Sequence, residues 1–213
     1  MSPWAGDRQV GRTAPSADSR PSGPKIGVLA LQGAFAEHAA AFRSLGATAV
    51  EVRSPRDLGP VDGLVLPGGE STTMALLLAS SGLDMAIARC LADGMPVFGT
   101  CAGLILLAAE IADGRPNQRS FGVLDVTVTR NGYGRQRDSF EAPLAVDGLG
   151  PGGPVTAVFI RAPRITRCGA AVEVLASVGG DPVLVRQGSV LAASFHPELS
   201  GDLRLHHLFL GGT

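Results

Sequence analysis

The sequence predicts a three-layer α/β fold in which a mostly parallel sheet lies between helices. Two observations support this prediction. Short apolar runs of strand length alternate with segments of helical spacing through the first half of the chain, and the loops between them are short. These runs are apolar throughout, which is typical of strands covered on both faces. In the second half, strand-like runs follow one another and predict an antiparallel extension of the sheet.

The first half can be assigned element by element. The predicted strands are Ile26–Leu31, Thr48–Val52, Gly63–Leu66 and Pro96–Gly99. The predicted helices are Ala34–Leu45, Ser71–Leu78 and Leu83–Leu91, and Ser54–Pro60 is predicted as loop. Ligands bind beyond the carboxyl ends of strands in such sheets. We therefore expect three loops to converge on one crevice: Gln32-Gly33, Pro67–Ser71 and Thr100–Gly103.

The second half is more polar and is interrupted by turn residues. Its predicted strands are Gly122–Thr129, Val155–Ile160, Val172–Val178, Pro182–Arg186 and Ser189–Phe195, and Asp202–Leu210 is predicted as a closing helix. Residues 1–24 are rich in Pro, Gly, Ser and Arg, which predicts a disordered extension. The remaining residues, 25–213, are expected to form one domain.

Composition excludes several classes of protein. The chain has 213 residues, 45% of them apolar, and a formal net charge of −1, so nucleic acid and anionic membranes are not the expected ligands. Three sparse cysteines argue against a disulfide framework and favour the cytoplasm. The N-terminus lacks the apolar core of a secretory signal. His206 and His207 are adjacent in a predicted helix and should point to different faces, so no metal site is expected.

Cys101 lies in a stretch that predicts an exposed nucleophile. In Pro96–Leu107 a buried strand leads through Gly-Thr-Cys-Ala-Gly (99–103) into an apolar helix. This is the spacing of the G-x-S-x-G nucleophile elbow of hydrolases, with cysteine in place of serine. The alternative is a buried structural thiol between glycines. A catalytic role therefore needs a base, an oxyanion site and a substrate pocket from elsewhere in the chain.

The segment SFHPEL (194–199) supplies a candidate base. Pro197 favours extended backbone at the residue before it. In an extended segment, residues i and i+2 project to the same side, so Glu198 is predicted to reach and orient the imidazole of His196. A His-Pro-Glu turn on the surface is the alternative. If His196 also meets Cys101, its imidazolium form would stabilise the thiolate, which is the attacking form of cysteine.

A third segment, LPGGESTT (66–73), is a candidate oxyanion loop. Gly68 and Gly69 allow backbone N–H groups to approach a ligand closely, and the N–H of Ala102 is a further candidate donor. The alternative is an ordinary connection from strand to helix in which Ser71 is the N-cap. No Gly-Lys-Ser/Thr follows, so the segment is not a Walker loop.

Together, the motifs PGGES, GTCAG and HPE, in this order, resemble those of the class I (triad) glutamine amidotransferases. Six segments are similar to those of one family, the glutaminase subunits of pyridoxal 5′-phosphate synthases: IGVLALQGAFAEH, LPGGESTTM, FGTCAGLILLA, RNGYGRQRDSFEA, VFIRAP and SFHPEL. The similarity runs from about Lys25 to Phe209. It implies a flavodoxin-like amidotransferase domain that hydrolyses L-glutamine to L-glutamate and ammonia.

The resemblance also implies a role for each residue. It makes Cys101 the nucleophile, His196 the general base and acid, and Glu198 the group that orients His196. It assigns the binding of L-glutamine to Gly69, Glu70, Ser71, Arg130, Ile160 and Arg161, and the oxyanion hole to Gly68, Gly69 and Ala102. Without the resemblance, Arg130 and Arg161 would be interpreted as surface charges. Beside the site, a guanidinium is suited to hold the α-carboxylate of glutamine.

The implied partner is a (β/α)8-barrel synthase subunit, in a hetero-oligomer with many copies of each chain. In the family, the barrel combines ammonia with a pentose phosphate and a triose phosphate. No cofactor or metal is expected here. Three alternatives stay open: a glutaminase of another pathway, a different cysteine hydrolase such as a peptidase, and a non-catalytic regulatory subunit. The chain departs from the family in its extension, residues 1–24, and in ending soon after Leu210.

Overall fold

A seven-stranded sheet forms the centre of the protein. The computed structural model describes residues 23–115, 118–132 and 139–211. In spatial order the strands are β10 (Glu173–Val178), β11 (Asp181–Gln187), β12 (Val190–Ala193), β4 (Val97–Thr100), β3 (Gly63–Leu66), β1 (Lys25–Leu29) and β2 (Thr48–Val52). The run from β12 to β2 is parallel, and β10 and β11 add two antiparallel strands at one edge.

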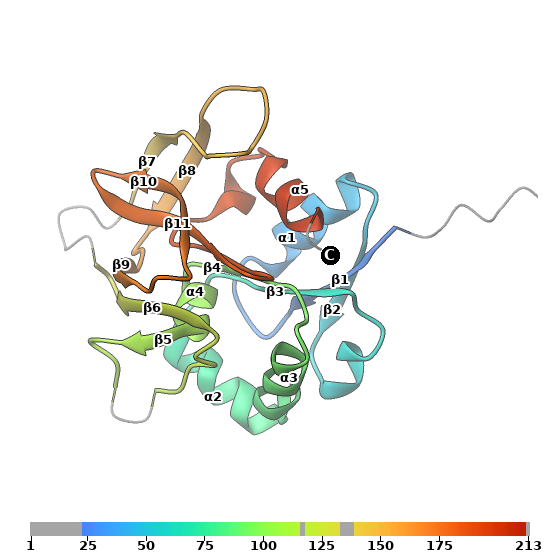
Figure 1. Cartoon of the computed structure of the whole chain (residues 1–213). Coiled ribbons are helices and arrows are strands. Elements are labelled where there is room, and N and C mark those ends of the chain that lie inside the picture. Colours follow the sequence, from blue (N-terminus) through green and yellow to red (C-terminus); the bar gives the residue numbers. More distant parts are fainter. Residues whose placement is uncertain (1–22, 116–117, 133–138, 212–213) are drawn as a thin grey trace, which may run out of the picture.

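Helices cover both faces of this sheet, so the predicted three-layer fold is confirmed. Helices α1 (Phe35–Ser44) and α5 (Arg204–Leu210) lie on one side, and α2 (Ser71–Ser81), α3 (Leu83–Ala92) and α4 (Ala102–Leu107) lie on the other (Figure 1). Within β3, Leu64 and Leu66 belong to the apolar cluster on the α2–α3 side, whereas Val65 belongs to the cluster on the α1–α5 side. Burial on both faces explains why this strand is apolar throughout.

The predicted antiparallel extension is only partly correct. Strands β10 and β11 extend the sheet as expected, but β12 pairs in parallel with β4. Other strands leave the main sheet: β5 (Ala108–Ile111), β6 (Leu124–Thr129) and β9 (Arg164–Cys168) form a three-stranded sheet, and β7 (Ser139–Leu144) and β8 (Val155–Ile160) form a hairpin. Strands β5, β7 and β9 were not predicted, because β5 continues the apolar run of α4, β7 begins in a polar segment of the sequence, and β9 is mostly exposed.

Two further comparisons concern the ends of elements and the terminus. The predicted loop at Ser54–Pro60 contains a short 3-10 helix, η1 (Pro55–Leu58). The predicted extension lies almost wholly outside the described residues, and Pro24 already accepts a hydrogen bond from the amide of Thr48 at 2.9 Å.

Among the described helices, none is by itself long and apolar enough to span a bilayer. Helices α2 and α3 meet the length and composition criteria only as a pair bent by 95°.

Candidate active site

Cys101 lies on the sharp turn that its glycine spacing predicts. It follows β4, adopts φ 50° and ψ −103°, and immediately precedes α4. A Cβ on Gly103 would overlap the carbonyl of Leu66 in β3, so only glycine lets α4 pack this closely on the sheet. The amide of Cys101 donates to the carbonyl of Ala193 at 2.8 Å, which ties the turn to β12. The side chain is therefore held rigidly at the carboxyl edge of the parallel strands.

His196 and Glu198 lie just beyond β12, the strand next to β4. The Nδ1 atom of His196 is 2.7 Å from Oε1 of Glu198, as the sequence predicted. The backbone reason is different from the one predicted. Residues Pro197–Leu199 form a 3-10 helix, η3, so it is a tight turn and not an extended segment that brings the carboxylate under the imidazole. The amide of His196 donates to the carbonyl of Val158 in β8 at 2.8 Å, which fixes its position.

The electrostatics of this group favour an ion pair. Burial lowers the pKa of His196, but hydrogen bonds with Cys101 and Glu198 outweigh burial and raise that pKa from 6.5 to about 10. Burial alone would raise the pKa of Glu198, but hydrogen bonds from His196 and His38 hold it well below its usual value. The imidazole therefore stays protonated at neutral pH between an ionised carboxylate and the Cys101 sulfur. A cation beside sulfur stabilises the thiolate form.

The three predicted loops do converge, since Gly69, Glu70 and Ser71 of the second loop line one pocket with Cys101 of the third, and the first loop contacts the second. Gln32 Nε2 donates to the carbonyl of Glu70 at 2.7 Å, and a Cβ on Gly33 would overlap the carbonyl of Gly68. A Cβ on Gly68 would in turn overlap Cε1 of His196, so the candidate oxyanion loop lies directly against the imidazole. Gly69 has φ 155°, which favours glycine.

One pocket of about 220 Å³ collects most of the predicted residues. It is lined by Gly69, Glu70, Ser71, Cys101, Ile105, Arg130, Asn131, Ile160, Arg161 and His196. All six residues that the resemblance assigns to glutamine binding are in this set. Three predicted site residues, Gly68, Ala102 and Glu198, do not line this pocket. Since these residues come from β4, β8, β12 and the loops after β3 and β6, only the fold brings them together.

Backbone strain concentrates at the same pocket. In the described part of the chain, three residues other than glycine have positive φ: Cys101 at 50°, Asn131 at 47° and Arg161 at 44°. All three line the pocket. Such conformations persist only where the surrounding structure enforces them, and they cluster at functional sites.

Glu70 and Ser71 organise the start of α2. Glu70 is the N-cap, and its carboxylate accepts hydrogen bonds from the amides of Thr72 and Thr73 at 3.1 and 2.7 Å. Burial opposes ionisation, but these bonds outweigh it and lower the pKa of Glu70 to about 2. The alternative in which Ser71 is the N-cap is therefore wrong. Ser71 is buried, and its Oγ accepts from Nε2 of Gln118 at 2.9 Å.

Arg130 is held in place at the rim of the pocket. Its Nη1 donates to Oγ1 of Thr72 at 3.2 Å and its Nη2 donates to the carbonyl of Asp113 at 3.0 Å. Its Nε is buried and has no hydrogen-bond partner among the described residues. This is not the environment of a solvated surface charge. Arg161 lies directly after Ile160, the last residue of β8, and lines the same pocket.

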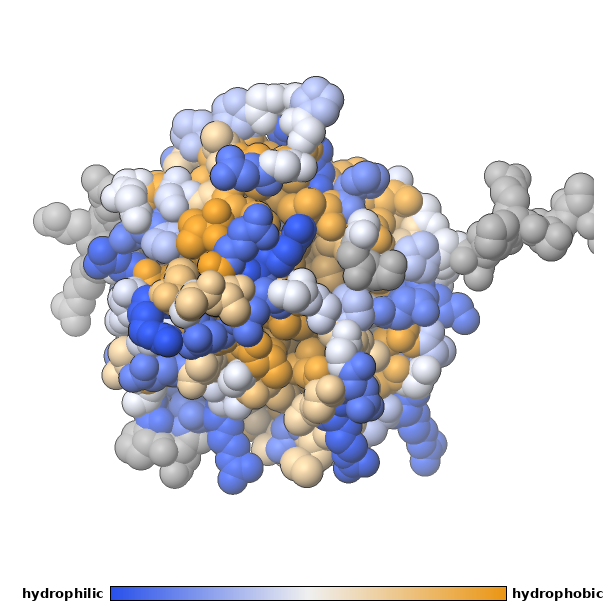
Figure 2. Space-filling view, viewed as in Figure 1, coloured by the Kyte–Doolittle hydropathy of each residue, from blue (hydrophilic) through white to orange (hydrophobic). Residues whose placement is uncertain are grey.

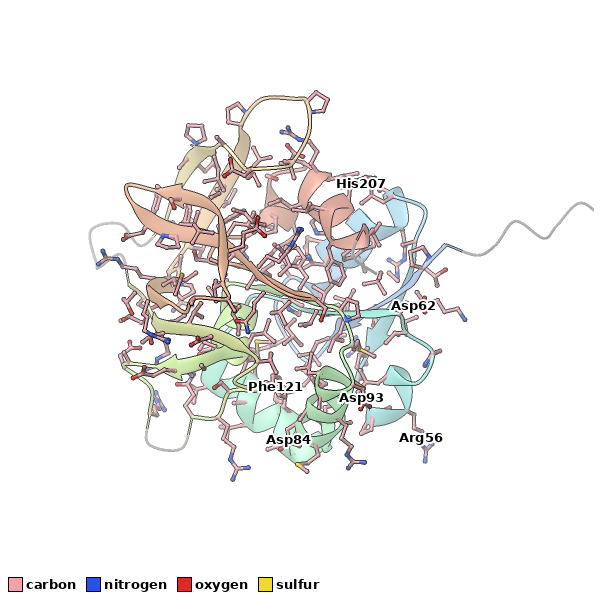
Figure 3. The ribbon with its side chains drawn as sticks, in the orientation of Figure 1. Arg56, Asp62, Asp84, Asp93, Phe121 and His207 are labelled. Carbon is pink, nitrogen blue, oxygen red and sulfur yellow. The ribbon has the colours of Figure 1, made fainter. Side chains whose placement is uncertain are left out.

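A second, larger pocket contains none of the predicted catalytic residues. It measures about 710 Å³ and is formed by α2, α3 and the segment that ends at Phe121. Asp84 and Phe121, two of its lining residues, lie on the α2–α3 side of the sheet (Figure 3). Apolar side chains gather over these helices in the lower half of the face shown in Figure 2. Neither Cys101 nor His196 lines this pocket.

Sequence reasoning missed several residues around the site. Asn131 lines the pocket, and Gln118 and Asp113 hold Ser71 and Arg130. His38 and His206 are fully buried behind Glu198. The available signal for His38 was a polar residue on the apolar face of a predicted helix. His206 is buried and His207 exposed, as their adjacency predicted, and no group of three metal-binding side chains occurs among the described residues.

A three-layer α/β fold with a cysteine on the turn between β4 and α4, and a His–Glu pair just beyond the neighbouring strand, is the arrangement of a class I glutamine amidotransferase. The comparisons with known proteins then give the family: residues 28–212 match the SNO glutamine amidotransferase family, and the chain belongs to it. A relative from Frankia alni, "Pyridoxal 5′-phosphate synthase subunit PdxT", is 57% identical over 189 residues, which cover 89% of this chain and 94% of the relative. A relative of the same name from Mycobacteroides abscessus is 56% identical over 187 residues, covering 88% of this chain and 96% of its own.

Solved structures agree with this assignment. A crystal structure described as glutamine amidotransferase superposes with a TM-score of 0.82 at 51% identity, covering 88% of this chain and 99% of that chain. A chain in the structure of PurLQS from Thermotoga maritima superposes with a TM-score of 0.65 at 18% identity, covering 89% of this chain and 98% of that chain. The second likeness shows the fold alone.

Proposed function

We propose that this chain is the glutaminase subunit of a pyridoxal 5′-phosphate synthase. It hydrolyses L-glutamine to L-glutamate and ammonia and delivers the ammonia to a synthase subunit. The observation that carries the proposal is one pocket in which Cys101, His196 and the residues of the predicted glutamine site come together, with Glu198 behind the imidazole. The names of relatives above 50% identity support the same pathway.

The first half of the reaction forms a thioester. The Cys101 thiolate attacks the side-chain carbonyl carbon of glutamine, and the carbonyl oxygen becomes an oxyanion. The His196 imidazolium then gives its proton to the amide nitrogen, the carbon–nitrogen bond breaks, and ammonia leaves. Glu198 keeps its charge throughout and stabilises the imidazolium through Nδ1, which it contacts at 2.7 Å.

The second half releases glutamate. Neutral His196 takes a proton from water, and the oxygen attacks the γ-glutamyl thioester. Collapse of the second tetrahedral intermediate expels the Cys101 thiolate and restores the ion pair. Backbone N–H groups of Gly68, Gly69 and Ala102 are the proposed donors to both oxyanions. One such donor typically lowers the activation free energy by about 3 kcal/mol.

The pocket fits the two ends of the free amino acid. Arg130 and Arg161 are the proposed partners of the α-carboxylate, and the ionised Glu70 is placed to attract the α-ammonium group. The loop at Ser71 and the backbone of Ile160 border the side chain of glutamine. A volume of about 220 Å³ is enough for one small amino acid.

The proposed partner is a (β/α)8-barrel synthase subunit in a hetero-oligomer with many copies of each chain. The names of the relatives support a partner, since each is called a subunit of a synthase. The proposed compartment is the cytoplasm, which the three free cysteines of the chain support.

The test is glutamine hydrolysis with and without the barrel subunit of the same organism, in wild type and Cys101→Ala. We expect the barrel to stimulate glutamate release by the wild type and Cys101→Ala to release none. If another synthase stimulated the activity and the barrel subunit did not, the pathway would be wrong. If Cys101→Ala kept full activity, the nucleophile would be wrong.

A further inference from the structure

A line of buried polar side chains continues behind Glu198, on the side away from the pocket. His38 in α1 and His206 in α5 are both fully buried. Nε2 of His38 lies 3.2 Å from Oε2 of Glu198 and 3.1 Å from Oγ1 of Thr100. Nδ1 of His38 lies 2.9 Å from Nε2 of His206. Four polar side chains thus meet in an otherwise apolar core formed by Phe42, Phe98 and Phe209.

The hydrogen-bond partners fix the tautomers of both histidines. Nδ1 of His206 is buried and has no hydrogen-bond partner among the described residues. A buried N–H without an acceptor is unfavourable, so the proton of His206 lies on Nε2. That N–H donates to Nδ1 of His38, which must then be unprotonated. The remaining nitrogen of His38, Nε2, carries its proton and points it toward Glu198 and Thr100.

The second carboxylate oxygen of Glu198 depends on this N–H group for a hydrogen-bond donor. Its Oε1 is paired with His196 at 2.7 Å, but its Oε2 is buried and has no donor of regular geometry among the described residues. The nearest donor is Nε2–H of His38, shared between Glu198 and Thr100. A buried carboxylate oxygen without a donor is unfavourable for the ionised form. His38 therefore both orients the carboxylate plane and favours its charge.

We propose that His38 is a positioning residue of the glutaminase centre, and that it acts on Cys101 through Glu198 and His196. The inference rests on the proposed function, since it assigns His38 to the hydrolysis of glutamine. His206 supports His38 by fixing its tautomer. Both residues lie outside the pocket and touch no substrate.

The charged and titratable groups around this line are few. Glu198 faces His196 and His38, and His38 faces His206 and Thr100. Asp202, just before α5, acts on His206 electrostatically. Burial and then the neighbouring His38 lower the pKa of His206 to about 3, so His206 stays neutral as the tautomer argument requires. The low pKa of Glu198 is consistent with donors at both oxygens.

The first test reads the tautomers directly. The chain has four histidines, so single substitutions assign every ring in long-range ¹H–¹⁵N spectra of the free protein. We expect a proton on Nε2 of His38 and a proton on Nε2 of His206. A His38 ring with a proton on Nδ1 and none on Nε2 would overturn the proposal, because Nε2 would then have no proton to share with Glu198. This readout needs neither glutamine nor a partner subunit.

The second test measures how the Cys101 thiolate depends on pH. Alkylation of Cys101 by iodoacetamide, followed by peptide mass spectrometry, reports the thiolate in the free protein. In a plot of the alkylation rate against pH, the low-pH limb is the range over which the rate falls as pH falls. His38→Leu removes the donor, so Glu198 should take up a proton at higher pH, and the low-pH limb should move to higher pH by about one to two units. His38→Gln places an amide N–H near the position of Nε2 and should restore most of the wild-type limb.

The matched control is Phe209→Leu, which loosens the same aromatic cluster and leaves the contact with Glu198 intact. It should lower Tm and leave the low-pH limb unchanged. If Phe209→Leu moved the limb as far as His38→Leu, or if His38→Leu left it in place, the positioning role would be refuted. Wild type that alkylates as expected but never hydrolyses glutamine with any synthase would refute the proposed function instead.

Discussion

Glu198→Gln separates a carboxylate that orients His196 from one that merely fills space. The two side chains have nearly the same shape, so the backbone of η3 should not change. In the wild type, both nitrogens that face the carboxylate are donors: Nδ1 of His196 at 2.7 Å and Nε2 of His38 at 3.2 Å. A glutamine amide has one acceptor atom and one donor group. Its NH₂ group must therefore face an N–H group of either His196 or His38, and no hydrogen bond can form in that contact. The substitution therefore removes the charge and breaks one side of the arrangement.

The size of the effect follows from the contact with His196. A hydrogen bond to a charged group contributes about 1.5–3 kcal/mol, and this one stabilises an imidazolium that must persist until ammonia departs. Losing it should lower kcat/KM for glutamine by about 10- to 150-fold. The KM should change little, since Glu198 does not line the pocket. His196→Ala removes the proton donor itself and should lower kcat/KM further.

The assay is glutamate release in the presence of the synthase subunit, across a range of glutamine concentrations, for wild type, Glu198→Gln and His196→Ala. Circular dichroism and Tm control for folding. An equal loss in the two variants would refute the division of roles between Glu198 and His196. Unchanged kcat/KM in Glu198→Gln would refute the orienting role altogether.

Three further predictions concern the loop, the substrate and the pH dependence of stability. Gly68→Ala places a methyl group against Cε1 of His196, so glutaminase activity should fall at least tenfold with a small change in Tm. Wild-type activity in this variant would show that the loop is not in contact with the imidazole. Arg130→Lys keeps the charge but loses the planar guanidinium whose two terminal nitrogens bind Thr72 and Asp113, so KM for glutamine should rise several-fold with kcat nearly constant. A change in kcat alone would contradict a binding role. The pKa of His206 falls from 6.5 to about 3 on folding, so the unfolded chain binds a proton that the folded chain refuses, and the free energy of unfolding should fall as pH falls from about 6.5 toward 3. Urea unfolding at pH 7 and pH 5 should show a smaller fall in His206→Leu, and an equal fall in both proteins would contradict the assignment.

The elements nearest the candidate nucleophile could be predicted from the sequence alone. Runs such as Gly63–Leu66 and Val97–Thr100 are buried on both faces, and their apolar character therefore identifies them directly. The turn at Cys101 was predictable for a related reason. Its two glycines are required by close contacts of the backbone, and such contacts leave a fixed spacing in the sequence.

The second half of the chain was harder to predict. Strand β7 alternates between exposed and less exposed residues, but over only six residues that begin in a polar segment of the sequence. Strand β9 is mostly exposed and gains its partner only in the folded protein. The parallel pairing of β12 with β4 joins segments far apart in the sequence. For the same reason, the position of His38 behind Glu198 required the fold. Its helix predicted a buried face but gave no sign of which polar group it meets.

In the proposed reaction, Cys101 is the nucleophile that takes the γ-glutamyl group of glutamine. The most direct test is acid quenching of the complex with the synthase subunit during turnover of ¹⁴C-labelled glutamine, followed by digestion and mapping of the label. We expect label in a base-labile linkage on the peptide that contains Cys101. Glutamate production with no label on that peptide, or with label on another residue, would contradict it.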